Sequence, residues 1–134
     1  MKIIQDIWII QENGIVLFSR VFHEQIHEQL FGALMSALST FADQISEHGL
    51  KSLDLNNKRF TLKRKKGLLF ICNSSRKVKE KKVQQELDKL AENFLIKYPN
   101  APVDQEGDIS IYSGFKTEIE NILEDPIKKF WNDF

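Results

Sequence analysis

The segment from Glu24 to His48 constrains the fold most, because it is the one long stretch whose apolar residues keep an unbroken helical period. These side chains recur at steps of four and three residues, which places them on one stripe of an α-helix. They are Ile26, Leu30, Leu34, Leu38, Phe41 and Ile45. Strand-like segments flank the helix on both sides. We therefore expect the stripe to face a β-sheet, with the later helices packed elsewhere.

Five short segments read as strands. Residues 3–10 are so continuously apolar that they predict a central strand, and Asn13-Gly14 predicts a hairpin turn into a second strand over residues 15–22. After the long helix, residues 50–55 and 59–63 alternate apolar and polar side chains, as a half-exposed hairpin does. The run Leu68–Cys72 is apolar on both faces and predicts a buried strand.

Two helices are predicted to follow the strands. Asn73-Ser74-Ser75 breaks the strand pattern, and either serine can cap a helix that runs to about Lys97. Its apolar side holds Val83, Leu87, Leu90, Ala91, Phe94, Leu95 and Tyr98. A last helix begins near Ser113, with Phe115, Ile119, Ile122 and Leu123 facing inward. The terminal aromatics Phe130, Trp131 and Phe134 either pack on the domain, which we favour, or contact a partner.

The sequence thus predicts an α+β fold with a five-stranded antiparallel sheet and the element order β-β-α-β-β-β-α-α. A length of 134 residues suits one domain spanning residues 1–134. No apolar run approaches the roughly 20 residues of a membrane-spanning helix, and Asp6 interrupts any signal peptide. The single cysteine, Cys72, cannot form an internal disulfide. We therefore expect a cytoplasmic protein, with peripheral association at membranes as a further expectation.

Charge is balanced overall but concentrated in the middle of the chain. Residues 58–82 hold eleven Lys and Arg against one acid, Glu80. We expect part of this segment to attract an acidic surface or lipid headgroups. The candidates are Lys63, Arg64, Lys65, Lys66, Arg76, Lys77, Lys79, Lys81 and Lys82. An ordinary solvated surface is an equal alternative. Nucleic-acid binding is a weaker alternative, because no aromatic residue interleaves the basic runs to stack on bases.

The order and pattern of these segments resemble the longin domain, a member of the SNARE-like fold, over essentially all of the chain. The related roadblock fold begins with a helix, whereas this chain begins with a strand. The resemblance implies a non-enzymatic interaction module in membrane trafficking or small-GTPase regulation, similar to a freestanding adaptor, tethering-complex or regulator subunit. It implies no cofactor. The implied partners are a small GTPase or another longin or roadblock-type subunit, in a homodimer or a heterodimer.

Partners of longin domains commonly use the first helix and the adjacent sheet edge. Phe31, Met35 and Ala42 lie beside the expected core stripe and widen the apolar face of that helix. We therefore predict that these three residues bind a partner. The alternative is that the last helix covers them.

A different class of function is suggested by His23-Glu24-Gln25-Ile26-His27, which matches the His-Glu-x-x-His motif of zinc metallopeptidases. In that motif two histidines one helical turn apart bind zinc and the glutamate activates water. The match falls at a strand-to-helix junction, and the nearby Glu47 and His48 lie too far along the same helix to be the third ligand. An acid of the later helices, such as Glu86 or Glu92, would have to serve. A zinc peptidase using His23 and His27 is therefore kept as an alternative, and the main prediction has no metal site.

Overall fold

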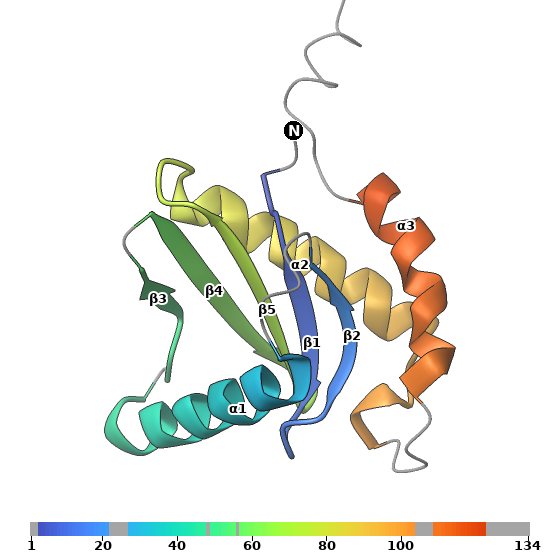
Figure 1. Cartoon of the computed structure of the whole chain (residues 1–134), viewed down its shortest axis with the longest axis horizontal. Coiled ribbons are helices and arrows are strands. Elements are labelled where there is room, and N and C mark those ends of the chain that lie inside the picture. Colours follow the sequence, from blue (N-terminus) through green and yellow to red (C-terminus); the bar gives the residue numbers. More distant parts are fainter. Residues whose placement is uncertain (1–2, 22–26, 48, 56, 104–108, 123–134) are drawn as a thin grey trace, which may run out of the picture.

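The computed structural model of the chain describes residues 3–21, 27–47, 49–55, 57–103 and 109–122. The strands in this part are β1 (Ile7–Gln11), β2 (Val16–Arg20), β3 (Ser52–Asp54), β4 (Lys58–Lys65) and β5 (Leu68–Ser75). The helices are α1 (Glu28–Ile45), α2 (Glu80–Lys97) and α3 (Phe115–Ile122), with the short 3₁₀ helices η1 (Ala101–Val103) and η2 (Ile109–Gly114). This order confirms the predicted α+β fold (Figure 1).

All five strands form one antiparallel sheet in the order β2-β1-β5-β4-β3. The opening hairpin turns at Gly14, whose φ of +91° suits glycine, and the Asn13 side chain accepts a hydrogen bond from the Ile15 N–H at 3.0 Å. In β1, Ile9 lies opposite Phe18 of β2 on one side and Phe70 of β5 on the other. The hairpin and the later meander therefore belong to one layer.

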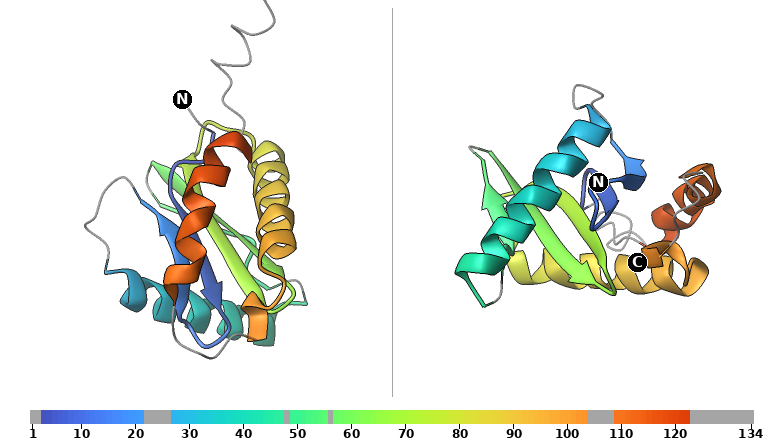
Figure 2. Two further views of the ribbon diagram at one scale, coloured as in Figure 1. Left: turned by 90° about the vertical axis from the view of Figure 1, so that its right-hand side faces the viewer. Right: turned by 90° about the horizontal axis from the view of Figure 1, so that it is seen from below.

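Helices cover both faces of this sheet. Figure 2 shows α1 on one side and α2 with α3 on the other. Because successive strand residues point to opposite faces, Trp8 and Ile10 join the core under α1, whereas Ile7 and Ile9 join the core under α2 and α3. Strand β1 is accordingly central and buried on both faces, as its continuous apolar run predicts.

A β-bulge in β2 directs two side chains towards α3. Ile9 pairs with Phe18 but Ile10 pairs with Val16, so Leu17 is the extra residue. Val16 faces α1, yet Leu17 and Phe18 both join the opposite core. Beyond the bulge, Phe18 meets Phe115 edge to face at 5.5 Å, and Arg20 pairs with Glu120 at 2.5 Å. The bulge therefore brings an aromatic and a charged anchor to α3.

The face of α1 that meets the sheet differs from the predicted one. The buried residues of α1 are Gly32, Met35 and Ser39, whereas four members of the predicted core stripe are exposed. Their exposed fractions are 69% for Leu30, 55% for Leu34, 61% for Phe41 and 72% for Ile45. The prediction was wrong for these four residues, whereas the half-buried Leu38 packs against the core as predicted. The error arises because α1 is apolar over most of its circumference, and close approach to the hairpin requires small residues. Ile26 lies outside the described residues.

Strand β5 is longer than predicted and includes Asn73-Ser74-Ser75. The Asn73 side chain accepts a hydrogen bond from the Asp6 N–H at 2.8 Å and donates to the Asp6 carboxylate at 3.0 Å. Asn73 is thus a buried strand residue with its polar groups satisfied. The N-cap of α2 is Lys79, whose side chain makes no capping hydrogen bond, so the predicted serine cap was wrong.

The last helices pack as their apolar periods predict. In α2, the residues Val83, Leu87, Leu90, Ala91, Phe94 and Leu95 are buried, and Tyr98 packs against the same core. In α3, Phe115 and Ile119 are buried, and Ile122 packs beside them. Leu123 and the three terminal aromatics lie outside the described residues. Since α3 covers the face opposite α1, it cannot cover Phe31, Met35 or Ala42.

We predict that Gly32→Ala destabilises the protein. A Cβ at this position would lie 2.4 Å from the Gly14 carbonyl oxygen and 2.7 Å from Val16 Cγ2, so α1 would have to move off the hairpin. Without this clash, replacing glycine by alanine in a helix gains up to about 1 kcal/mol. We expect instead a loss of about 1–3 kcal/mol in the free energy of unfolding, measured by denaturant titration.

Gly114→Ala is the matched control, because the nearest atom to its added Cβ is the Tyr98 hydroxyl oxygen at 3.5 Å, an ordinary contact. It should change stability far less. A Gly32→Ala protein as stable as the wild type would show that α1 does not pack so closely on the hairpin.

We also predict that Cys72 makes the protein less stable at alkaline pH. Burial raises the pKa of the Cys72 thiol far above its ordinary value. Below about pH 8.5 the thiol is neutral in both the folded and the unfolded chain. Above this pH it ionises in the unfolded chain alone, which lowers the free energy of unfolding as the pH rises. The free energy of unfolding should therefore fall more steeply between about pH 8.5 and 10 than in Cys72→Ala. Parallel pH profiles of the two proteins would contradict this.

Candidate protein-interaction surface

The outer stripe of α1 (Leu30, Leu34, Phe41 and Ile45) is the largest concentration of exposed apolar side chains on any one described element. Single exposed apolar residues are normal, but a row of them on one helix face marks a contact surface. Helix α1 contains no lysine or arginine, and its acids are Glu28 in the first turn and Asp43 near the end. Both acids contact the sheet, Asp43 through Arg64 and Glu28 through Ser19, so the outer stripe is an uncharged apolar face.

Strand β3 adds two apolar residues on the same side of the molecule. Figure 1 shows β3 at one edge of the sheet, on the side where α1 has its C-terminal end. β3 is an outer strand of the sheet, and Leu53 and the following Leu55 are exposed. An outer strand presents unpaired backbone groups that another chain can bind. The outer stripe and β3 together form the candidate surface.

The three residues predicted to bind a partner lie between the outer stripe and the side of α1 that meets the sheet, about 70 to 110° from the middle of the stripe. Met35 is 2% exposed, and the half-buried Phe31 ring lies 4.5 Å from Trp8 and 6.0 Å from Phe60. Ala42 is half-buried. Met35 and Phe31 thus pack on the sheet, where the sequence predicted partner binding, and most of the predicted core stripe is exposed instead. The overlooked signal is the small pair Gly32 and Ser39, which marks the face that approaches the hairpin most closely.

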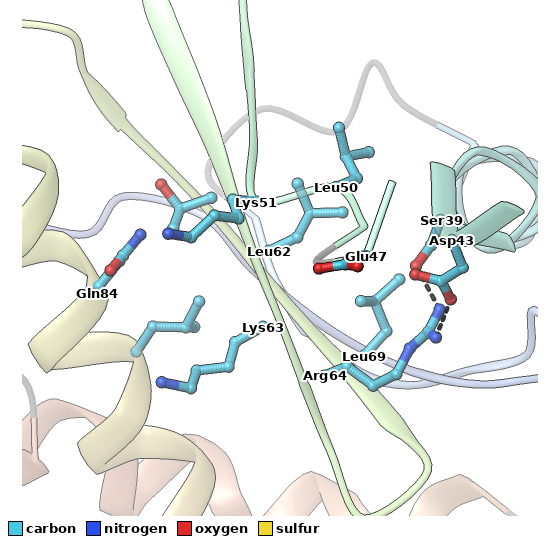
Figure 3. Close-up of a pocket in the computed structure, with 12 residues that line it drawn as sticks. Ser39, Asp43, Glu47, Leu50, Lys51, Leu62, Lys63, Arg64, Leu69 and Gln84 are labelled. Atoms are coloured by element: carbon cyan, nitrogen blue, oxygen red, sulfur yellow. Dashed lines mark hydrogen bonds and ion pairs between the residues drawn. The ribbon is translucent and has the colours of Figure 1, made fainter. Parts of the chain in front are cut away.

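An ion pair fixes the C-terminal half of α1 above β4. The Arg64 guanidinium donates to the Asp43 carboxylate and to the Ser39 hydroxyl, as Figure 3 shows. These groups border a pocket of about 290 Å³ between α1, β4 and α2, which Lys51, Lys63 and Gln84 also line. Little apolar packing lies beneath this half of the helix, because none of its residues beyond Ser39 is fully buried. Arg64 therefore helps to set the position of Phe41 and Ile45.

The nine candidate basic residues do not form one surface. Lys63, Arg64, Lys65 and Lys66 lie at the β4–β5 turn, whereas the other five follow the far end of β5, roughly 25 Å away at about 3.3 Å per residue. Several of them pair with carboxylates of this chain. Lys63 pairs with Asp88, Arg64 with Asp43, Lys65 with Glu92 and Arg76 with Asp54. Among the described candidates, the neighbouring exposed lysines at positions 77, 79, 81 and 82 lie at the start of α2 and just before it.

Asp54 is the main acid within that second basic group. Its hydrogen bond from Arg59, at 2.8 Å, lowers the pKa of its carboxyl group, and the charges of Arg59 and Arg76 act in the same direction. The group is thus partly neutralised locally. Whether it attracts lipid headgroups stays a prediction. Among the described residues, no helix is long and apolar enough to cross a membrane.

The position of His27 does not suit the zinc-peptidase motif. His27 is the N-cap of α1, with an extended backbone, and its Nδ1 accepts a hydrogen bond from the Leu30 N–H at 3.3 Å. The motif requires both histidines on a continuous helix. His23 lies outside the described residues. Within the part of the chain that the structure describes, no three His, Cys, Asp or Glu side chains gather as a metal site would require.

Several solved structures share this fold. Myxococcus xanthus MglB matches with a TM-score of 0.57 and 14% identity, over 77% of this chain and 82% of that chain. A roadblock/LC7 domain from Streptomyces avermitilis matches with a TM-score of 0.59 and 12% identity, over 71% and 84%. A second MglB structure, described as having a tetrameric arrangement, matches with a TM-score of 0.53 and 13% identity, over 72% and 77%. At these identities the similarity shows the fold alone.

Sequence comparison identifies the family directly. No curated protein matches the chain significantly. The family model for the first longin domain of FUZ, MON1 and HPS1, however, matches residues 5–105, which include β1 to η1. That match spans most of the chain and agrees with the strand-first topology described above. The protein belongs to the family of first longin domains of FUZ, MON1 and HPS1.

Proposed function

We propose that this protein is a non-enzymatic interaction module that binds a second longin or roadblock-type subunit through the outer stripe of α1 and strand β3. The observation that carries the proposal is the exposure of Leu30, Leu34, Phe41 and Ile45 on one helix face. Burying an apolar side chain of this size contributes about 1.5–3 kcal/mol. Four such residues supply enough apolar area for the centre of an interface.

We propose that the partner is a different chain rather than a second copy of this one. The outer stripe itself is uncharged, and both acids of α1 are engaged within the chain, Asp43 by Arg64 and Glu28 by the Ser19 hydroxyl. Charge on α1 therefore does not select the partner, and the stripe would pack on any complementary apolar helix face. The proposed complex is a heterodimer, which the size of the purified protein distinguishes from a homodimer.

The cellular role we propose is membrane trafficking or small-GTPase regulation. Support comes from the longin family, whose members include subunits of adaptors, tethering complexes and exchange factors for small GTPases. The tetrameric arrangement described for MglB supports assembly through this fold, although it is a property of that protein. A small GTPase is accordingly the second partner class, which would bind once the heterodimer has formed.

We predict that Leu34→Asp combined with Phe41→Asp abolishes partner binding without unfolding the domain. Both side chains are exposed, so the charges are tolerated in the free protein but are buried unpaired in the complex. Tagged protein should recover a longin- or roadblock-containing protein from lysate of its own cells, identified by mass spectrometry. The double variant should recover at least about tenfold less, since each buried charge costs several kcal/mol.

Ile96→Asp is the control, because Ile96 is 80% exposed but lies on α2, on the other side of the sheet. It should recover the same partner as the wild type. Light scattering of the purified protein should give a monomer. Equal recovery by the double variant, or a homodimer that the double variant leaves intact, would refute the proposed interface.

A further inference from the structure

A groove follows the outer edge of β2, at the side of the sheet away from β3. Its floor is four consecutive residues of that strand, Val16–Ser19. Glu28, the first residue of α1, forms one wall, and Ile109, Ser113 and Lys116 of η2 and α3 form the other. The groove holds about 270 Å³. Figure 1 shows β2 at the edge of the sheet, between the start of α1 and α3.

The first position of this edge already binds a peptide-like group. The Gln29 side chain accepts a hydrogen bond from the Val16 N–H at 3.1 Å, and its amide nitrogen lies 3.5 Å from the Val16 carbonyl oxygen. The peptide group of a neighbouring antiparallel strand makes the same pair of contacts. Gln29 therefore fills the Val16 step of a backbone ladder along the outer edge of β2, and an added strand would continue beyond it, towards Ser19.

The two walls of the groove differ in chemistry. On the η2 side, Ile109 is 37% exposed, and the neighbouring Ile111 is also exposed. On the α1 side, Glu28 stands over the edge and accepts a hydrogen bond from the Ser19 hydroxyl. Successive side chains of an extended peptide point in opposite directions, so one would meet the apolar wall and the next would meet Glu28.

We propose that this groove binds an extended peptide segment, which adds to β2 as a sixth strand. The peptide places an apolar side chain against Ile109 and a basic side chain beside Glu28. An extended strand is the occupant that fits, because a helix has no free backbone groups to pair with a sheet edge. The bulge at Leu17 and the inward-turned Arg20 limit the pairing to a short segment. This site is separate from the outer stripe of α1 and does not depend on the proposed function.

The test uses the full chain and a phage-displayed library of random peptides of about 12 residues, long enough for one added strand with flanks. Selected peptides should alternate apolar and basic residues. In proton–nitrogen NMR spectra, a synthetic selected peptide should shift the amide signals of Val16–Ser19. N-methylation at alternate backbone nitrogens of the peptide should raise Kd at least about tenfold, since it removes the ladder donors.

Two exposed residues give a matched pair of variants. Ser113 and Thr117 each donate a hydroxyl hydrogen bond to the carbonyl three residues earlier, at 2.7 and 3.0 Å, but only Ser113 lines the groove. Ser113→Arg should therefore weaken peptide binding, while Thr117→Arg should not, with both proteins checked by thermal unfolding. Leu34→Asp should bind the peptide normally, which separates this site from the α1 interface.

The proposal is overturned if no peptide is selected, or if the selected peptides shift the signals of α1 instead of β2. It is also overturned if N-methylated peptides bind as tightly as the parent, because the contact is then not an added strand. Equal affinity for Ser113→Arg and Thr117→Arg would likewise exclude the groove.

Discussion

The pairing of β1 with β5 is the interaction on which the rest of this structure depends. It joins two parts of the chain about 60 residues apart in sequence, with Ile7 opposite Cys72 and Gln11 opposite Leu68. A two-stranded hairpin is marginally stable by itself, and neither the opening hairpin nor the meander could cover a helix alone. Once β1 is central, both faces of one sheet become available. The Asp6–Asn73 hydrogen bonds extend the pairing beyond β1, so the backbone leading into the sheet is fixed as well.

The bulge in β2 links this sheet to the arrangement of the helices around it. Without the extra residue, Phe18 and Arg20 would share the α1 face with Val16, away from Phe115 and Glu120 of α3. With it, Phe18 packs on Phe115 and Arg20 reaches both Glu120 and the Gln5 carbonyl oxygen, at 2.6 Å. Helix α3 is thereby held beside the edge of β2 but does not cover it. The same irregularity thus anchors the last helix and shapes the groove along the strand.

The sequence predicted the element order, the single sheet and the core face of α2 correctly, because each rests on a local period or turn residue. Asn13-Gly14 fixes the hairpin, and Val83, Leu87, Leu90 and Phe94 leave α2 one apolar side. The orientation of α1 could not be obtained in this way. Both of its faces are apolar, and the choice between them depends on the contact of Gly32 with Gly14, eighteen residues earlier. Hydrophobic periodicity shows how apolar each helix face is, but it does not show where the backbones of a helix and a strand must come so close that only small side chains fit between them.

The charge pattern could not show how the basic residues are distributed in space, for a related reason. Lys63 and Lys79 are close in sequence, but the eight residues of β5 carry the chain across the sheet between them. The basic residues of the β4–β5 turn form ion pairs with α1 and α2, such as Arg64 with Asp43 and Lys65 with Glu92. These pairs help to hold the two helices on the sheet. The groove beside β2 had no sequence signal at all, because it needs η2 and the start of α1 to stand on either side of one strand.

Helix α1 both packs on the sheet and presents an apolar surface, because different residues serve the two purposes. Its small side chains, Gly32 and Ser39, let it lie close to the hairpin and to Arg64, and Met35 and Phe31 fill the core beneath it, so Leu30, Leu34, Phe41 and Ile45 are not needed there. Those residues are left on the outside, where they cost solubility unless a partner covers them. Two polar contacts fix the helix on the sheet. Arg64 pairs with Asp43, and Ser36 donates a hydrogen bond to the Glu12 carbonyl oxygen at 2.7 Å, so the outer stripe lies on a rigid element. A partner that binds it loses little conformational entropy in ordering the helix, which favours tight association for the area buried.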